Sequence, residues 1–166
     1  MSSFSLIMWY YKGKRQEEVI MKIIIDADAC PKGAKKSCEE QAKKYGIELV
    51  MVVDEAHELS GNFTVVQVGQ GNDSVDHKIT TMCKPGDILV TQDYGLASIL
   101  LQRAGGVIHP KGMIYTIFNI DSLMFQRHMG QKARKAGKRT KGPKKRTMED
   151  DKEFERNLAS LLENSK

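Results

Sequence analysis

The stretch 21–31, Met-Lys-Ile-Ile-Ile-Asp-Ala-Asp-Ala-Cys-Pro, constrains the fold more than any other. A continuous apolar run that ends in Asp26 and Asp28 is typical of a strand buried on both faces, as in a parallel sheet. Pro31 is a helix-start signal, so we expect it at the first helical position with Cys30 as the cap. The stretch therefore predicts a strand, an acidic turn and a helix. In open α/β sheets, ligands bind beyond the carboxyl ends of the strands, which is where both aspartates should lie.

Strands and helices alternate along the rest of the chain. Apolar runs predict further strands at 47–53, 63–68 and 87–93, a short one at 105–110, and 113–116 could form a sixth. Apolar residues recur at helical spacing between these runs. Helical spacing resumes after the last strand, and a capping box at 147–150 opens a final helix over 148–164. The alternation predicts an α/β fold with a parallel sheet and right-handed crossovers.

We expect a single domain over 21–164, because a chain of 166 residues suffices for one complete core. Residues 1–20 look like a leader or an extension outside this fold, and Met21 could be the true start. Their apolar part precedes their basic part, which is the reverse of a secretory signal. No apolar run approaches the length of a membrane span. The scattered cysteines form no C-x-x-C pair or zinc spacing, which fits a reducing cytoplasm.

The net charge of +5 conceals a strong asymmetry. The basic segment 127–146 contains ten Lys or Arg and no Asp or Glu, while the remaining chain carries 16 basic and 21 acidic residues. Charge divided in this way suggests a polyanionic partner such as RNA. A merely solvated surface is the alternative, although ten like charges without a counter-charge favour it less. The ten candidate nucleic-acid contacts are Arg127, Lys132, Arg134, Lys135, Lys138, Arg139, Lys141, Lys144, Lys145 and Arg146.

Acidic residues follow three of the predicted strands. Asp26 and Asp28 follow the first strand, Asp73 and Asp76 open the helix after the third, and Asp93 closes the fourth. If the strands are parallel, these clusters share one edge of the sheet. Clustered carboxylates repel each other unless a cation lies between them. Hard oxygen ligands suit Mg²⁺ or Mn²⁺, which can activate water and polarise a phosphate.

Helix capping is the competing explanation for the same residues, because Asp is a favoured N-cap and every cluster precedes a helix. Taken singly, Asp73 and Asp93 are explained by capping. Asp26 and Asp28 fit that explanation less well, since Cys30 would occupy the cap position. The three clusters together therefore favour a metal site.

Several motifs resemble a known family. They are the DADACP string at 26–31, GNDSVD at 71–76, PGDILVTQD at 85–93, and the Gly-Pro segment at 142–143 before a leucine-rich last helix. Together they resemble the YaiI/YqxD family, a bacterial group of unassigned function that is usually placed among PIN-like domains. The resemblance covers residues 21 to about 162. The DADACP string is its most specific part.

The resemblance implies a PIN-like fold, with a central parallel sheet flanked by helices on both sides and, here, a C-terminal helical extension. PIN domains are typically Mg²⁺- or Mn²⁺-dependent ribonucleases. By that analogy, Asp26, Asp73 and Asp93 would be the core metal ligands, and Asp28 and Asp76 would add ligands or orient water. The D-x-D at the first strand departs from the standard PIN arrangement. The resulting expectation is a cytoplasmic, metal-dependent nuclease acting on RNA.

Two other functions remain open at this level. A strand followed by Asp26-Ala-Asp28 also looks like the nucleophile motif of haloacid-dehalogenase-type phosphatases, with Thr91 in the place of their second motif. Against this, the Gly-Asp-rich motif at 71–76 precedes Thr91, and no clear motif lysine follows. The second alternative is a non-catalytic RNA- or ribosome-associated protein, in which the basic segment supplies the affinity.

Overall fold

Five parallel strands form one sheet in the order β3-β2-β1-β4-β5. The computed structural model describes residues 20–54, 59–69, 71 and 74–165. Its strands are β1 (Lys22–Asp26), β2 (Glu48–Val53), β3 (Thr64–Gln67), β4 (Ile88–Val90) and β5 (Gly106–Ile108). The predicted α/β class and the parallel sheet are therefore confirmed.

The direction in which strands are added reverses between β1 and β4. From β1 the chain adds β2 and β3 on one side, then returns to add β4 and β5 on the other. β1 is the central strand, and Ile23, Ile24 and Ile25 are fully buried because both faces of the sheet are covered. Ligands of open α/β sheets bind at such a reversal, outside the carboxyl ends of the two strands.

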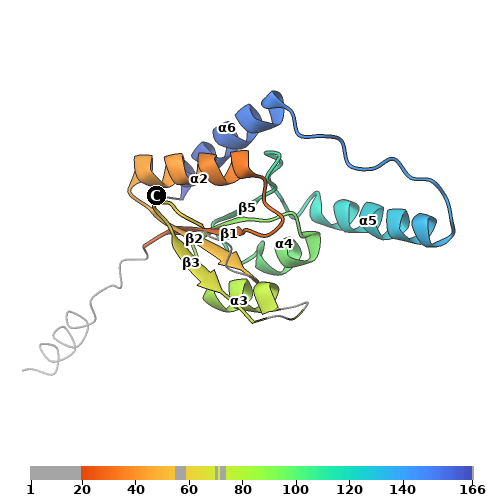
Figure 1. Cartoon of the computed structure of the whole chain (residues 1–166), viewed down its shortest axis with the longest axis horizontal. Helices are drawn as coiled ribbons and strands as arrows, with labels where there is room; N and C mark the ends of the chain where they lie inside the picture. Colours follow the sequence, from red (N-terminus) through yellow and green to blue (C-terminus); the bar gives the residue numbers. More distant parts are fainter. Residues whose placement is uncertain (1–19, 55–58, 70, 72–73, 166) are drawn as a thin grey trace, which may run out of the picture.

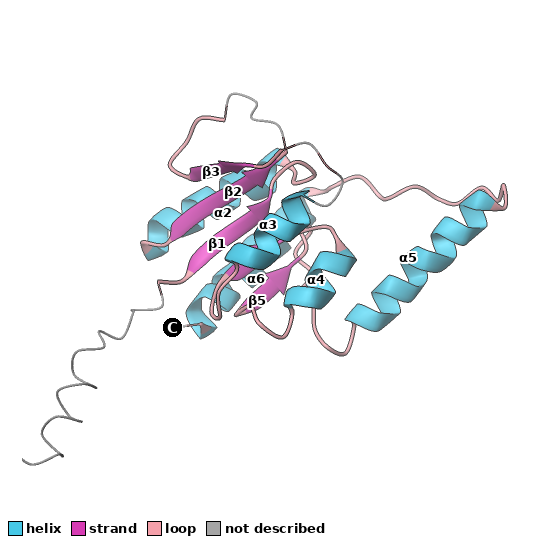
Figure 2. Cartoon of the chain, turned by 90° about the horizontal axis from the view of Figure 1, so that it is seen from below, coloured by secondary structure: helices cyan, strands magenta, loops and turns pink. Residues whose placement is uncertain are grey.

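Helices cover both faces of the sheet (Figure 1 and Figure 2). On one face α2 (Lys32–Tyr45) and α6 (Met148–Asn164) pack side by side, and on the other lie α3 (Ser74–Met82) and α4 (Tyr94–Leu100). The first layer buries Cys38, Phe154 and Leu158, and the second buries Ile79 and Leu96. Each of the buried Phe, Leu and Ile side chains contributes about 1.5–3 kcal/mol. No helix in the described part of the chain has both the length and the apolar character that a membrane crossing requires.

Helix α5 (Ile120–Lys135) leaves this layered body and projects away from it (Figure 2). Only its first turns pack against the body, through buried Ile120 and partly buried Leu123. After the left-handed Gly137 (φ 77°), the chain runs back to α6 without helix or strand. We call residues 136–147 the returning arm. The basic segment 127–146 is thus divided between the outer part of α5 and this arm.

Two local predictions are wrong, and one is confirmed. Residues 113–116 form no sixth strand, because Ile114 makes only an isolated antiparallel bridge with Ile108. Pro31 is the N-cap rather than the first helical residue, since its ψ of 147° is extended and the helix begins at Lys32. The capping box of α6 is present: Thr147 Oγ1 accepts from the Asp150 N–H, and the Asp150 carboxylate accepts from the Thr147 N–H.

Candidate functional site

Asp26 and Thr91 meet at the carboxyl ends of β1 and β4, at the reversal in strand order. The Thr91 hydroxyl donates to Asp26 Oδ2 at 3.0 Å and accepts from the Asp93 backbone N–H at 3.0 Å. Thr91 is fully buried, and its carbonyl accepts from the Tyr115 hydroxyl at 3.1 Å. Because the Thr91 hydroxyl bridges the two chain segments, it fixes the Asp26 carboxylate beside the start of α4.

Asp93 is the N-cap of α4. Its Oδ1 accepts from the backbone N–H groups of Gly95 at 2.8 Å and Leu96 at 3.1 Å. The Arg127 guanidinium on α5 lies 3.9 Å from the same oxygen. The capping explanation therefore holds for Asp93. The contacts with Gly95, Leu96 and Arg127 are all made by its Oδ1 atom.

Asp28 and Asp76 have different surroundings. Asp28 is exposed, and its Oδ2 accepts from the Asp54 backbone N–H at 2.9 Å, which ties the acidic turn to the end of β2. Asp76 lies in the first turn of α3 and is partly buried. Asp73 lies outside the described residues, so its predicted role stays a prediction.

Asp26 is where burial and negative charge coincide. Burial raises the pKa of Asp26 to about 6, the Thr91 hydrogen bond lowers it, and the charges of Asp76, Asp28 and Asp93 raise it. The carboxylates of three chain segments therefore act on one half-buried group. Within the described residues, however, no three His, Cys, Asp or Glu side chains are grouped as a complete metal site would need.

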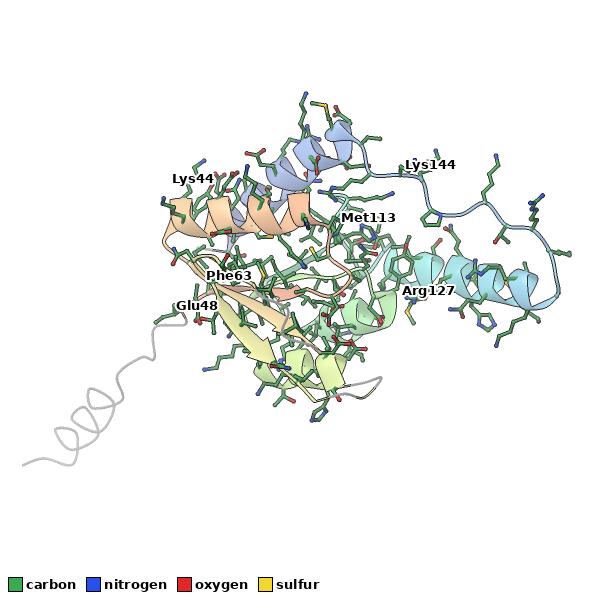
Figure 3. All side chains as sticks on the ribbon, viewed as in Figure 1. Lys44, Glu48, Phe63, Met113, Arg127 and Lys144 are labelled. Atoms are coloured by element: carbon green, nitrogen blue, oxygen red, sulfur yellow. The ribbon has the colours of Figure 1, made fainter. Side chains whose placement is uncertain are left out.

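A cleft of about 670 Å³ opens beside these residues, between the body and the basic segment. Gln92, Tyr94 and His109 line its body side, and Arg127, Arg134 and Lys141 are among the residues that line the opposite side. Figure 3 shows Arg127 on α5 next to the body and Lys144 on the returning arm. Gln92 and Tyr94 flank Asp93 in sequence, so the cleft adjoins Asp93.

Nine of the ten basic candidates are exposed, four on α5 and five on the returning arm. Arg146 differs from them. Its Nε donates to Asp151 Oδ1 at 2.6 Å, its Nη1 donates to the Pro110 carbonyl, and its guanidinium lies 5.9 Å from the Phe154 ring centre. Arg146 therefore fastens the end of the returning arm to the body.

Sequence reasoning missed Tyr94 and His109. The only available signal for Tyr94 was its position directly after Asp93. His109 shares no ligand spacing with another histidine, and only the fold brings β5 and its following turn to the cleft. In the sequence Thr91 resembles the second phosphatase motif, and its bridging hydroxyl becomes visible only when β1 and β4 are paired.

Comparison with known proteins gives the family. The family model described as "Uncharacterized BCR, YaiI/YqxD family" matches residues 24–164. The chain belongs to this family. Residues 24–164 include most of β1, the other four strands, all the helices named above and the returning arm, so the resemblance of the DADACP and associated motifs is confirmed.

Curated relatives of the family cover most of the chain. A "UPF0178 protein" of Ruminiclostridium cellulolyticum is 48% identical over 143 residues, which is 86% of this chain and 92% of that protein. One from Exiguobacterium sibiricum is 46% identical over 144 residues (86% and 96%), and one from Clostridium tetani is 42% identical over 147 residues (88% and 99%). No solved structure matches. These family and protein names state no activity.

Proposed function

We propose that this chain is a divalent-metal-dependent phosphodiesterase that cleaves RNA. One observation supports it most: Asp26, at the reversal point of the sheet, is half-buried and surrounded by the charges of Asp76, Asp28 and Asp93. Burial and the neighbouring negative charges, which raise the pKa of Asp26 to about 6, destabilise its ionised form in the folded protein. A bound cation would relieve the repulsion between these carboxylates. We further propose a cytoplasmic location, because Cys30, Cys38 and Cys83 are free and buried.

The donor set fits a hard cation chemically. Asp26, Asp73 and Asp93 would hold Mg²⁺ or Mn²⁺ through carboxylate oxygens, the ligands these ions prefer. A bound divalent ion would supply charge for a phosphate oxygen and lower the pKa of a water molecule. The described residues alone do not complete the ligand set. Asp73 is therefore the residue on which a complete site depends most.

The remaining roles fall to other side chains. Thr91 positions Asp26 through its 3.0 Å hydrogen bond, and Arg127 lies 3.9 Å from Asp93 and lines the cleft, where it can contact a phosphate. The exposed basic residues of α5 and the returning arm would attract the RNA backbone toward an otherwise acidic body. Asp28 or Asp76 would orient the attacking water.

The test is cleavage of a mixed RNA pool with Mn²⁺ or Mg²⁺. Asp26→Asn removes one charge with little change of volume, so it should abolish cleavage while the fold persists. Glu155→Gln, which removes one exposed charge from α6, is the matched control and should keep full activity. Full activity of Asp26→Asn, or wild-type cleavage that a chelator does not reduce, would refute the proposal.

A phosphatase is the second candidate, because the Thr91 hydroxyl contacts Asp26, as a helper of an aspartyl nucleophile would. Mass spectrometry after incubation with a phosphate monoester distinguishes the two. A phosphorylated Asp26 would establish the phosphatase and end the nuclease proposal. RNA binding with no metal binding and no cleavage would favour the non-catalytic alternative.

A further inference from the structure

The cleft next to Asp93 has one positively charged wall and one aromatic wall. Arg134 of α5 and Lys141 of the returning arm contribute positive charge to one side. Tyr94 and His109 contribute aromatic rings from the body. A volume of about 670 Å³ lies within the range of about 300–1,000 Å³ that is usual for sites holding one small-molecule-sized unit. The cleft therefore suits a ligand with a flat ring at one end and negative charge at the other.

The Tyr94 ring is held in place before any ligand arrives. Its centroid lies 5.8 Å from that of Tyr115, with the rings inclined at 69° in an edge-to-face contact. The Arg127 guanidinium lies 5.7 Å from the centroid of the same ring. Tyr94 remains partly exposed and lines the cleft. A ring fixed in this way binds another ring with little loss of conformational entropy.

His109 offers a neutral hydrogen-bond donor in the same wall. Its Nδ1 accepts from the Lys111 backbone N–H at 3.0 Å, so the ring proton of the neutral imidazole lies on Nε2. Burial lowers the pKa of His109 to about 4, and the charges of Lys111 and Arg146 lower it too. The imidazole is therefore uncharged at neutral pH, and its Nε2–H suits a carbonyl oxygen of a base.

We propose that this cleft binds an unpaired nucleotide of single-stranded RNA, with the base on the Tyr94 and His109 wall and the phosphates toward Arg134 and Lys141. This deepens the proposed function, on which it rests, by naming the form of the RNA. A basic groove combined with aromatic rings is typical of single-strand binding, because every unpaired base offers a face for stacking. A base inside a duplex is already stacked and paired, so it offers no such face.

The experiment measures binding of a labelled 12-nucleotide RNA strand and of a 12-base-pair RNA duplex by fluorescence anisotropy, using the full chain in EDTA. The duplex carries about twice as many phosphates, so charge alone would favour it. We expect the single strand to bind at least tenfold more tightly. Duplex binding that is equal or tighter would overturn the proposal.

Variants locate the binding in the cleft. Tyr94→Leu should weaken single-strand binding about tenfold through lost stacking, whereas Tyr45→Leu, at the C-terminal end of α2 and outside the cleft, should leave it unchanged. The logarithm of the binding constant falls linearly with the logarithm of the salt concentration, and Arg134→Gln combined with Lys141→Gln should make this slope shallower by about 1.4. The control for that pair is Arg156→Gln, an exposed residue of α6. If Tyr94→Leu fails to fold, the variant with both Arg134→Gln and Lys141→Gln, compared with its Arg156→Gln control, tests the proposal instead. Unchanged affinity in the cleft variants would also overturn the proposal.

Because EDTA prevents metal-dependent cleavage, binding is measured separately from catalysis. Single-strand binding at the cleft without any cleavage in Mn²⁺ would leave this proposal standing and remove the nuclease. Equal binding of duplex and single strand, together with their cleavage at equal rates in Mn²⁺, would overturn this proposal and leave the nuclease proposal standing.

Discussion

Asp26 combines two conditions that each disfavour a negative charge, burial and neighbouring carboxylates. The Thr91 hydrogen bond opposes them but does not outweigh them, since the pKa still rises to about 6. A folded-state pKa above the ordinary 3.8 means that the folded protein holds this proton more tightly than the unfolded chain. The metal-free protein therefore loses stability as pH rises from about 4 through about 6.

Asp26→Asn should stabilise the metal-free protein. Asn cannot ionise but can still accept from Thr91, so the variant should exceed wild type by about 1–3 kcal/mol at pH 7.5. The difference should shrink as pH falls through 6 and vanish near pH 3.5, where both side chains are neutral. Urea unfolding in EDTA at several pH values measures it. Glu155→Gln should show no such pH-dependent gain, and a less stable Asp26→Asn at pH 7.5 would contradict this account.

Thr91→Val tests the bridge between Asp26 and Asp93. The change keeps the side-chain volume but removes the hydroxyl, leaving the Asp93 N–H and Asp26 Oδ2 without that partner. We expect a loss of about 1–3 kcal/mol, together with a further rise in the pKa of Asp26. Denaturant unfolding across pH reports both effects. Thr91→Ser keeps the hydroxyl and should retain most of the stability, so equal losses in the two variants would point to packing instead.

At the scale of elements, α5 shows where apolar spacing misleads. Ile120, Leu123, Met124 and Phe125 all suggest a buried helix face, but only Ile120 and Leu123 pack against the body. Phe125 is 64% exposed and Met124 40%. Helical spacing identifies the helix but not how much of it meets a partner, because that depends on where the rest of the fold ends.

The returning arm should contribute to RNA binding but little to stability. Replacing Lys138, Arg139, Lys141, Lys144 and Lys145 by Gln removes exposed charges that bury little apolar area. RNA affinity should fall and its salt dependence should flatten by up to about 0.7 per lost phosphate contact. Fluorescence anisotropy at several salt concentrations measures this, with a thermal melt alongside. An unchanged salt slope would make the arm a solvated surface.

Arg146→Met should lower stability more than it lowers RNA binding. This guanidinium bonds Asp151 and the Pro110 carbonyl and lies over Phe154, so its loss frees the arm and leaves polar groups without partners. We expect a destabilisation of about 1–3 kcal/mol in a denaturant melt. RNA affinity per folded molecule should change less than in the five-residue variant. If Arg146→Met melts like wild type but binds RNA poorly, the residue belongs with the exposed nine.

For the whole molecule, the fold was readable from the sequence because a parallel sheet requires apolar runs separated by helices. Ile23, Ile24 and Ile25 show this, as each is fully buried in the central strand. The strand order was not readable, since nothing local to β1 or β4 encodes which strand it pairs with. The acidic turns were found because charge after an apolar run is conspicuous. The Thr91 bridge and the cleft walls could not be found in this way, because their residues come from distant segments of the chain.

The last prediction concerns metal binding by the intact chain. An ion that binds only the folded protein raises its stability by about 2.7 kcal/mol at a hundredfold excess over its Kd. For a chain of 166 residues, that corresponds to a rise in Tm of about 5–10 °C. We expect this rise in a thermal melt of wild type with Mn²⁺, and its reversal by excess EDTA.

Asp26→Asn separates a specific site from general attraction to an acidic body. That variant should begin with the higher Tm in EDTA and gain little from Mn²⁺, so the two proteins should converge or cross as metal is added. Glu155→Gln removes the same charge elsewhere and should keep the full gain, which excludes a simple change in net charge. An equal gain in all three proteins would mean that Mn²⁺ binds away from Asp26. No gain in any of them at millimolar Mn²⁺ would favour the RNA-binding alternative over the nuclease.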